Sequence, residues 1–381
     1  MSVWTGLGLL SLAIWLYLPL GRGGFWLTRE RDGDAAAPTR WPSVTAVVPA
    51  RNEADVIEQS IGSLLRQDYP GTLRVVLVDD GSDDGTAARA SAVGSSERLE
   101  VLTGSPLPAG WTGKVWAQNQ GVNHALASAD KPDYLLLTDA DIGHAPDNLR
   151  ALVAQAESQG LVLVSSMVEL SCQRWSERFL IPAFVFFFQM LYPFAWVADR
   201  NRSVAAAAGG CMLVRREALE RIGGMASIRS EIIDDCALAR QLKAQGPIRL
   251  GLTRRAKSLR PYEGLREIGR MVSRSAYAQL DYSLLMLAGT VAGLAITYLA
   301  PALLALFGHG PAQVAGLAAW LLMAAAFQPV LHFYRVSPLW GLALPAIATA
   351  YAVFTVQSAV AVWLGQGGQW KGRAQARMGE P

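Results

Sequence analysis

Charged side chains are scarce in this sequence, and their distribution is uneven. Asp, Glu, Lys and Arg make up 17% of the 381 residues, against about 25% in typical soluble domains. Four runs near the two ends carry no charged residue: 2–20, 282–308, 311–334 and 336–365. Each run is about as long as the ~20 apolar residues that cross a bilayer. The sequence therefore predicts an integral membrane protein with a polar central part.

The first apolar run lacks the basic start and the small-residue cleavage site of a secretory signal, so we interpret it as a retained anchor. Basic residues follow this run and precede the second one, which places the central part in the cytoplasm by the positive-inside rule. These residues are Arg22, Arg29, Arg31, Arg254, Arg255, Lys257, Arg260, Arg266, Arg270 and Arg274. The tail with Lys371, Arg373 and Arg377 would then lie outside, unless one of the late runs is re-entrant.

Cysteine and histidine are also few, and net charge is low. The net charge of +3 argues against nucleic acid as a partner. The three cysteines, Cys172, Cys211 and Cys236, fall in the central part, where a reducing compartment disfavours disulfides. The four histidines show no zinc-ligand spacing; only His144, three residues after Asp141, is a candidate ligand, and a weak one.

Short apolar segments alternate with segments of helical periodicity in the first half of the chain. Strands are predicted at 43–49, 74–78, 99–103 and 134–138, and helices at 55–66, 86–93, 114–129 and 146–159. This alternation predicts an α/β domain with a mostly parallel sheet. Ligands bind such sheets beyond the carboxyl ends of the strands.

The segment 179–197 is apolar and aromatic for about the length of a membrane span, but Pro182 and Pro193 interrupt it. A full crossing would divide one sheet between two sides of the membrane. We therefore predict an interfacial helix, with a buried core helix as the alternative.

Acidic residues follow two of the predicted strands. The sequence 78–86 has several acids, for which a helix-capping turn is an equally good explanation. Asp139 and Asp141 follow the strand 134–138 with one residue between them, and carboxylates this close favour a bound cation. Mg²⁺ or Mn²⁺ bridging a diphosphate fits these ligands. Asp-x-Asp alone is a weak pattern, and its position after a strand strengthens it.

A second acidic group, Asp234 and Asp235, begins a predicted helix, where acids also occur simply because they complement the helix dipole. Inverting sugar transfer needs a carboxylate to take the proton of the attacking hydroxyl. Asp235 is our candidate base, with Asp234 beside it. Lys114 begins another predicted helix after Gly113, a natural place for phosphate, although a solvated lysine is the plain alternative.

The motifs at 47–53 (Val-Val-Pro-Ala-Arg-Asn-Glu), 78–82 (Val-Asp-Asp-Gly-Ser), 139–141 (Asp-Ala-Asp) and 234–238 (Asp-Asp-x-x-Leu) occur in an order that resembles family 2 glycosyltransferases. Within that family, the sequence 110–117 (Gly-Trp-Thr-Gly-Lys-Val-Trp-Ala) and the late apolar runs are most similar to hopene-associated glycosyltransferases, relatives of ceramide glucosyltransferases. The resemblance implies the GT-A (nucleotide-diphospho-sugar transferase) fold and an inverting reaction.

The resemblance also implies roles for individual residues. The donor-binding residues would be Pro49, Ala50, Glu53, Asp79, Asp80, Lys114 and Asp139. The metal would be held by Asp141 with Asp139, and Asp235 would be the base. Gly210 and Cys211 would lie on the acceptor side, although a plain turn explains 209–212 nearly as well. A Gln-x-x-Arg-Trp motif is expected but only Arg274 of it is present, which argues against polymer synthesis and leaves Arg274 as an acceptor candidate.

The predicted organisation is an anchor at 1–21, a linker at 22–42, a catalytic domain at 43–262, a basic amphipathic connector at 263–280, transmembrane helices at 281–366 and a tail at 367–381. The expected activity is sugar transfer from a nucleotide sugar, by expectation a UDP-sugar, to a hopanoid-related lipid acceptor. A polyprenyl-phosphate sugar synthase and a catalytically silent membrane scaffold are the alternatives.

Overall fold

The computed structural model describes residues 2–33, 35–94, 97–367, 369–370 and 373–374. The chain divides into two compact units, each built from separate stretches of sequence. The sheet unit comprises Glu30–Leu170, Trp196–Arg260 and Gln369–Pro381, and the helix unit comprises Met1–Arg29, Ser171–Ala195 and Pro261–Gly368. Of the predicted tail, Lys371 and Arg377 lie outside the described residues.

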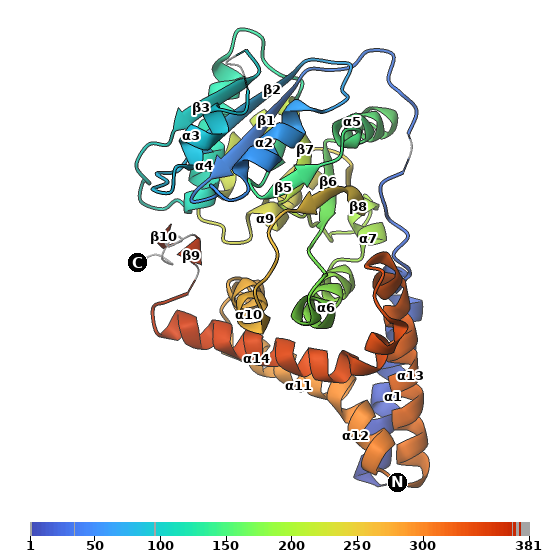
Figure 1. Cartoon of the computed structure of the whole chain (residues 1–381). Helices are drawn as coiled ribbons and strands as arrows, with labels where there is room; N and C mark the ends of the chain where they lie inside the picture. The colour runs from blue at the N-terminus through green and yellow to red at the C-terminus, as the bar shows by residue number, and fades with distance from the viewer. Residues whose placement is uncertain (1, 34, 95–96, 368, 371–372, 375–381) are drawn as a thin grey trace. The chain divides into compact units, whose positions relative to one another are not determined.

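The sheet unit is built on one eight-stranded sheet with the order β3-β2-β1-β4-β7-β6-β8-β5 (Figure 1). The strands are β1 (Val44–Ala50), β2 (Leu73–Asp79), β3 (Leu99–Thr103), β4 (Tyr134–Thr138), β5 (Ile142–His144), β6 (Leu163–Glu169), β7 (Cys211–Arg215) and β8 (Ile248–Ser258). The pairs β1–β2, β2–β3, β1–β4 and β6–β8 are parallel, and β7 and β5 are antiparallel to their neighbours. The predicted mostly parallel sheet is thus confirmed.

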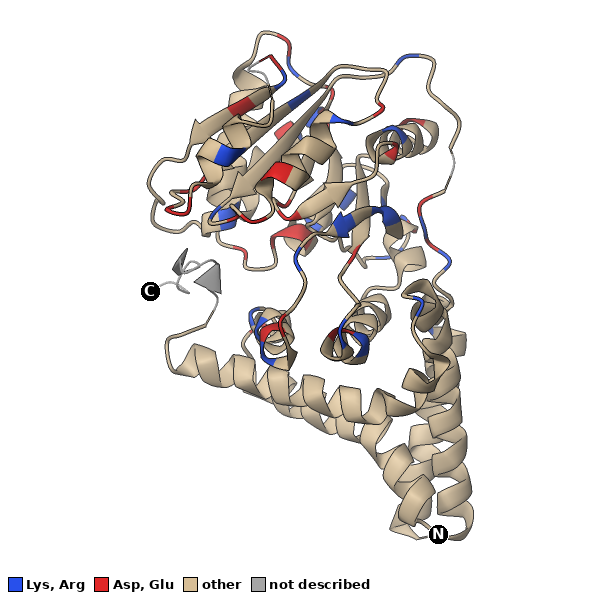
Figure 2. Cartoon of the chain, viewed as in Figure 1, with Lys and Arg blue, Asp and Glu red and all other residues tan. Residues whose placement is uncertain are grey.

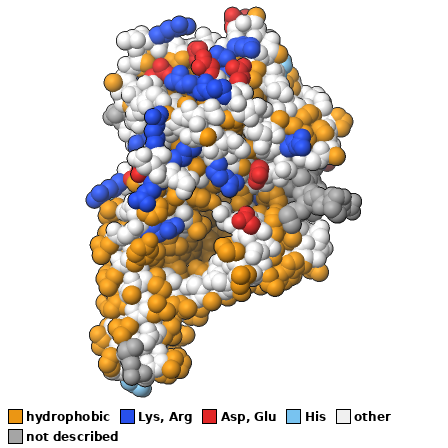
Figure 3. All heavy atoms as spheres, turned by 180° about the vertical axis from the view of Figure 1, so that it is seen from behind, with side chains coloured by type: hydrophobic (Ala, Val, Ile, Leu, Met, Phe, Trp, Pro, Cys, Tyr) orange, Lys and Arg blue, Asp and Glu red, His pale blue; other side chains and the backbone are white. Residues whose placement is uncertain are grey.

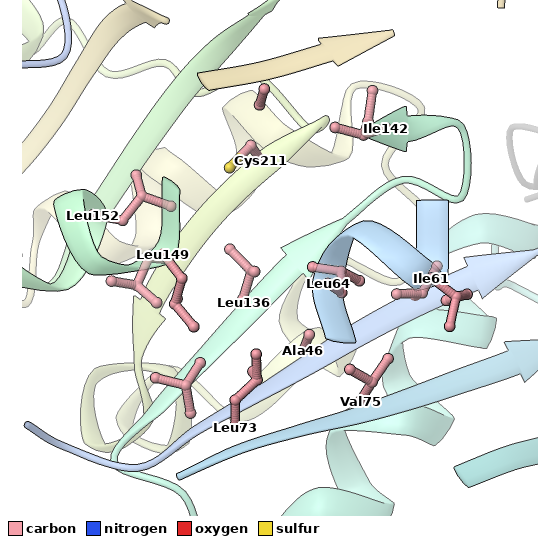
Figure 4. Packing of buried hydrophobic residues seen from close by; sticks show 14 of the residues in the cluster. Ala46, Ile61, Leu64, Leu73, Val75, Leu136, Ile142, Leu149, Leu152 and Cys211 are labelled. Carbon is pink, nitrogen blue, oxygen red and sulfur yellow. The ribbon is translucent and has the colours of Figure 1, made fainter. Parts of the chain in front are cut away.

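Helices cover both faces of this sheet. They are α2 (Ile57–Leu65), α3 (Thr86–Ser91), α4 (Gly113–Ala127), α5 (Asn148–Gln159), α8 (Arg216–Arg221) and α9 (Asp234–Lys243), with the 3-10 turn η2 (Gly224–Ile228). On one face α2, α3 and α5 pack on alternate residues of β1, β2 and β4 to form the main core; Figure 4 shows Ile61, Leu64 and Leu149 over Ala46 and Leu136. On the other face Ala117 of α4 packs on Val76 and Val78. The two-sided burial explains why these strands are continuously apolar.

The first four strands were predicted at 43–49, 74–78, 99–103 and 134–138. Each predicted end lies within one residue of the end that the structure shows. Sequence periodicity did not predict β5, β6 or β8. The antiparallel β7 was anticipated only as a strand-like stretch. These strands pair with partners distant in sequence, and local pattern alone carries little information about such pairing.

The helix unit contains long helices without charged side chains (Figure 2). Four helices are apolar and long enough to cross a membrane by length and composition: Val3–Gly21, Leu284–Phe307, Gly310–Phe333 and Pro338–Trp363. They contain α1 (Val3–Gly21), α11 (Leu284–Leu294), α12 (Ala300–Phe307), α13 (Gly310–Phe333) and α14 (Leu344–Trp363). Hydrophobic side chains dominate the surface of this unit in Figure 3. The four predicted apolar runs therefore correspond to four helices.

A π-helical segment, η4 (Ala295–Leu299), joins α11 to α12. Ser11 Oγ of α1 donates to the Ile296 carbonyl at 2.7 Å, and Trp15 Nε1 donates to the Thr297 carbonyl at 2.7 Å. A π-bulge leaves carbonyls without their usual helical partner, and such groups are costly in an apolar setting. The first helix satisfies two of them, and this ties α1 to the late helices.

The segment 179–197 forms two helices, so our prediction of one helix there was wrong in its bounds. α6 (Trp175–Leu191) tolerates Pro182 inside it and ends before Pro193, after which α7 (Phe194–Ala198) follows. Within the helix unit α6 packs through aromatic rings, with Phe186 against Phe327 and Phe187 against Tyr351. Its interfacial placement stays a prediction. The remaining short elements are η1 (Phe25–Leu27), α10 (Leu265–Ser273), η3 (Ala278–Leu280), η5 (Pro338–Ala343), β9 (Gln369–Trp370) and β10 (Arg373–Ala374).

We expect Gly121→Leu to destabilise the chain, because α4 approaches the sheet most closely at this residue. A Cβ at Gly121 would lie 2.6 Å from Val47 Cγ1 and 3.1 Å from Val78 Cγ2. Overpacking of this kind costs about 1–3 kcal/mol, measurable as a lower urea midpoint of the detergent-purified chain. Asn123→Ala, on the exposed side of α4, is the matched control and should change the unfolding free energy by less than about 0.5 kcal/mol. Equal midpoints for Gly121→Leu and wild type would contradict the close packing.

Candidate active site

Polar residues from five elements converge at the carboxyl edge of the sheet. β1, β2 and β4 end at this edge, and α4 and α9 begin at it. Backbone hydrogen bonds continue the pairing at the ends of these strands. Asp80 N after β2 donates to the Ala50 carbonyl of β1 at 2.8 Å, and Gly104 N after β3 donates to the Asp79 carbonyl of β2 at 2.8 Å. The parallel register between β1 and β2 thus fixes where both motifs end.

The predicted donor residues at this edge are held firmly but in different ways. Pro49 and Ala50 are buried in β1, so only their backbone can meet a ligand. Asp79 accepts hydrogen bonds from the Ser82 backbone N at 3.2 Å and from the Ser82 hydroxyl. It therefore holds the turn after β2, whereas the helix α3 begins after Gly85 without a side-chain cap. Asp80 is 1% exposed, and Arg51 lies 3.9 Å from its carboxylate.

Lys114 is the centre of the first charge cluster. Its Nζ lies 2.9 Å from Asp139 Oδ1 after β4 and 3.4 Å from Asp234 Oδ2 at the start of α9. Burial by itself lowers the pKa of Lys114, but Asp139, Asp234 and Asp235 outweigh it and hold the pKa above its ordinary value. Lys114 is therefore charged. It lies between Asp139, a predicted donor-binding residue, and Asp234, the neighbour of the predicted base.

Asp235 lies beside this cluster with both carboxylate oxygens fixed. Gly209 N donates to Oδ2 at 2.9 Å and Cys236 N donates to Oδ1 at 2.7 Å. Burial and the negative charge of Asp234 raise the pKa of Asp235 to about 6, against the opposing effect of Lys114. A carboxylate with this pKa is ionised at neutral pH and is a stronger base than an ordinary aspartate.

Gly209 is needed for this arrangement because of its position, not its flexibility. A Cβ added at Gly209 would lie 3.1 Å from Lys114 Nζ and 3.4 Å from Asp235 Oδ2. Glycine thus lets the backbone lie directly against both charged groups. The close contacts of Gly209 are therefore with Lys114 and Asp235.

Arg260 is the centre of a second charge cluster, and sequence reasoning gave it no role beyond a basic flank. It follows β8, forms a short ion pair with Glu53, and lies 3.0 Å from Asp55 Oδ1. Its charge also acts on Asp141. Burial, Asp139 and Glu53 raise the pKa of Asp141 to about 6, although Arg260 opposes them. Asp141 therefore carries negative charge that the surrounding residues do not fully balance.

Asp139 and Asp141 lie in the turn between β4 and β5, not in the strand, so their approach does not depend on alternation along a strand. The two are hard oxygen donors, which suit Mg²⁺ or Mn²⁺, and the raised pKa of Asp141 shows that a cation would relieve repulsion there. Among the described residues, no cluster of three or more His, Cys, Asp or Glu is arranged to hold a metal. Oxygens from the donor diphosphate would have to complete the coordination.

Within the described part of the chain, three other sequence candidates make no contact that assigns them to these clusters. The Cys211 side chain is fully buried in the core (Figure 4), and burial raises the pKa of its thiol to about 12, so its assignment to the acceptor is corrected. The Gly210 carbonyl accepts a hydrogen bond from Thr138 Oγ1 at 2.8 Å. Arg274 is an exposed residue of the helix unit, directly after α10.

His144 is a structural residue. Its Nδ1 lies 2.9 Å from Asn148 Nδ2, and its Nε2 lies 3.0 Å from Thr138 Oγ1. Since the amide nitrogen can only donate, Nδ1 accepts and Nε2 carries the proton. Burial lowers the pKa of His144 to about 4. Both ring nitrogens are thus used within the fold.

We expect Asp235→Asn to gain stability over wild type as pH rises. The folded pKa of about 6 exceeds the ordinary value of 3.8, so the stability that this group contributes is fully present below pH 3.8 and is lost as pH rises through 6. The difference in Tm, variant minus wild type, should increase by about 2 °C or more between pH 5 and 7.5.

Asp147→Asn is the matched control, because a hydrogen bond from Arg255 lowers the pKa of Asp147 below 3.8. Its stabilising contribution is present above pH 3.8 and is lost only at lower pH. Its Tm difference from wild type should be constant between pH 5 and 7.5. If the Tm difference between Asp235→Asn and wild type does not change between pH 5 and 7.5, the ionised form of Asp235 is not disfavoured in the folded chain.

Comparisons with known proteins match this geometry. A model of "Glycosyl transferase family 2" matches residues 45–223. An N-acetylglucosaminyltransferase of Mesorhizobium japonicum is 30% identical over 203 residues, covering 49% of this chain and 43% of that protein. A 4,4'-diaponeurosporenoate glycosyltransferase of Staphylococcus aureus is 27% identical over 208 residues, covering 53% and 52%. The chain thus spans about half the length of the curated relatives it matches.

One solved structure is similar over nearly the whole chain. The mannosyltransferase PcManGT from Pyrobaculum calidifontis, in complex with GDP-Man and Mn²⁺, superposes with a TM-score of 0.56 at 22% identity, covering 96% of this chain and 100% of that chain. At this identity the likeness establishes the fold alone. The family model thus matches residues 45–223, and the structural likeness indicates the GT-A fold.

Proposed function

We propose that the chain transfers a sugar, with inversion, from a nucleotide-diphosphate sugar to a hydroxyl of a lipid acceptor at the cytoplasmic face of a membrane. The observation that carries this proposal is the convergence of Lys114, Asp139, Asp141 and Asp235 at one edge of the sheet. A cation that faces a diphosphate, a carboxylate pair for a metal and a fixed base are the groups that this transfer requires.

The reaction can be assigned to these residues step by step. Asp235 takes the proton of the acceptor hydroxyl while that oxygen forms a bond to the anomeric carbon. The bond from the anomeric carbon to the diphosphate oxygen breaks on the opposite face, and its electron pair leaves with the diphosphate. Lys114 faces the negative charge that develops there. A divalent metal held by Asp141 and Asp139 would supply further neutralisation of the diphosphate when bound.

The residues around Asp141 fit such a metal. Its ligand atoms are oxygens, and burial together with the negative charges of Asp139 and Glu53 raises its pKa to about 6. Lys114 already neutralises part of Asp139. Asp141 is therefore the better candidate for direct coordination, and Asp139 for the side of the site nearest Lys114.

A hydroxyl acceptor is favoured over a phosphate acceptor by the environment of Asp235. A phosphate is already ionised and needs no base, whereas two backbone N–H groups here hold a carboxylate of raised pKa in one orientation. The four apolar helices support a lipid acceptor, as does the name of the 4,4'-diaponeurosporenoate glycosyltransferase. We further propose that the lipid acceptor is hopanoid-related, and this part of the proposal rests on the resemblance of the 110–117 motif.

We expect the detergent-purified chain to turn over one nucleotide sugar in the presence of Mn²⁺ or Mg²⁺ and to lose this activity with EDTA. A screen of UDP- and GDP-sugars with lipid extracts as acceptors identifies the donor. Asp141→Ala should lower kcat about 100-fold or more, because it removes the proposed metal ligand. Asp147→Asn is the control and should retain wild-type turnover. Wild-type rates in Asp141→Ala would refute this metal assignment.

The pH dependence of transfer tests the base. Since Asp235 must be ionised, kcat at saturating metal should fall about tenfold per pH unit below about pH 6 and be flat between pH 7 and 8. Bound metal keeps Asp141 ionised, so the acid limb then reports Asp235. Asp235→Asn should lower kcat by about 10²–10⁴ while leaving donor KM within about threefold. Retained activity in Asp235→Asn would instead favour a phosphate acceptor.

A further inference from the structure

Three arginines form a stripe along one side of α10 in the helix unit. Arg266, Arg270 and Arg274 are four residues apart, a spacing that places side chains on the same face of a helix. All three are exposed, whereas Ile268 and Val272 on the opposite side are buried. The helix is therefore strongly amphipathic, with a basic face turned outward.

The buried side of α10 is fixed to α14. Gly269 packs against Phe354, where an added Cβ would lie 2.7 Å from the ring. Ser273 Oγ donates to the Phe354 carbonyl at 2.9 Å, and Tyr277 N donates to Ser358 Oγ at 3.0 Å. Phe354 and Ser358 belong to the candidate membrane span Pro338–Trp363. The arginine stripe is thus held beside a helix that is apolar enough to lie in a bilayer.

The start of α6 extends this basic surface. Arg174 Nη1 donates to the Tyr262 carbonyl at 3.0 Å, and the Tyr262 backbone N donates to Glu177 Oε1 at 2.8 Å, which ties α6 to the residues before α10. Arg174 and Arg178 are exposed. Trp175 between them is 60% exposed, and tryptophan is enriched where membranes meet water. In Figure 2 the ribbons of both helices carry blue segments, which mark Lys and Arg positions.

The arginines on this surface are not neutralised by nearby acids. Over the part of the chain that the structure describes, no ion pair involves Arg178, Arg266, Arg270 or Arg274. Glu177 is buried and accepts three backbone hydrogen bonds, from Gln173, Arg174 and Tyr262. The surface therefore has an excess of positive charge that an anionic partner would balance.

We propose that this surface, Arg174, Arg178, Arg266, Arg270 and Arg274 on α6 and α10, binds the phosphate groups of anionic phospholipids in the adjoining leaflet. Its position beside a candidate span favours lipid headgroups over a soluble anion. Guanidinium groups bind phosphate oxygens in a bidentate manner, and each basic residue near an anionic membrane strengthens attachment severalfold. This role is separate from the proposed sugar transfer.

The test is thermal unfolding of the full-length detergent-purified chain titrated with phosphatidylglycerol or phosphatidylcholine. We expect phosphatidylglycerol to raise the Tm in a saturable way, and phosphatidylcholine or glycerol 3-phosphate at equal concentration to have little effect. The variant Arg178→Gln/Arg266→Gln/Arg270→Gln should need at least tenfold more phosphatidylglycerol for half of the shift. Arg274 is left unchanged because it is also an acceptor candidate.

Two further variants separate charge from folding. Arg40→Gln/Arg66→Gln/Arg98→Gln removes the same charge from exposed positions of the sheet unit and should respond to phosphatidylglycerol as wild type does. Substitution of the three helix-unit arginines by lysine should preserve most of the response. The proposal is overturned if wild type responds equally to both phospholipids, if glycerol 3-phosphate reproduces the shift, or if the glutamine variant titrates like wild type. Failure of sugar transfer would leave these outcomes unaffected.

Discussion

The candidate active site depends on one partly buried cation, the ammonium of Lys114. It lies 2.9 Å from Asp139 and 3.4 Å from Asp234, residues that reach it from β4 and from α9. Without Lys114 these carboxylates and Asp235 would repel one another in a poorly solvated place, a cost of several kcal/mol. Arg260 plays the same part for Glu53, Asp55 and Asp141. Each cluster has one cation and three carboxylates, so both retain negative charge. Burial together with this charge raises the pKa values of Asp141 and Asp235.

This retained charge connects stability with the proposed chemistry. An aspartate that is costly to ionise in the fold is, for the same reason, a better base and a better ligand for a cation. The resting chain therefore bears an unfavourable charge arrangement that a metal and a proton-bearing acceptor would relieve. The surrounding packing makes this possible: β1, β2 and β4 are almost fully buried, and the backbone of Gly209 lies against both Lys114 and Asp235. A local cost in folding free energy of this kind is usual at functional sites.

Sequence reasoning found the elements whose signal is local. The apolar runs gave the four long helices, and the strands β1 to β4 followed from short apolar segments that end in polar residues. The acidic positions 139, 141, 234 and 235 were also evident, because acids directly after a strand or at a helix start stand out. What was missed depends on distant pairing: β6, β8 and β5, and with them Arg260, whose partners Glu53 and Asp55 lie more than 200 residues away. Cys211 was misassigned because no local pattern shows on which face of β7 a side chain lies.

The division of the chain between the two units adds a last constraint. The chain passes from the sheet unit into the helix unit for the segment that contains α6 and then returns to the sheet unit. It passes into the helix unit again between Arg260 and Pro261. Arg260, which balances Glu53 and influences Asp141, is thus the last residue before the chain continues into α10. Only four residues separate Arg260 from the start of α10, whose buried face is fixed to α14. Arg260, which opposes the raised pKa of the candidate metal ligand Asp141, therefore lies on the direct covalent link to helices that are apolar enough to cross a bilayer. A mechanism for this chain therefore has to treat membrane attachment and site electrostatics together.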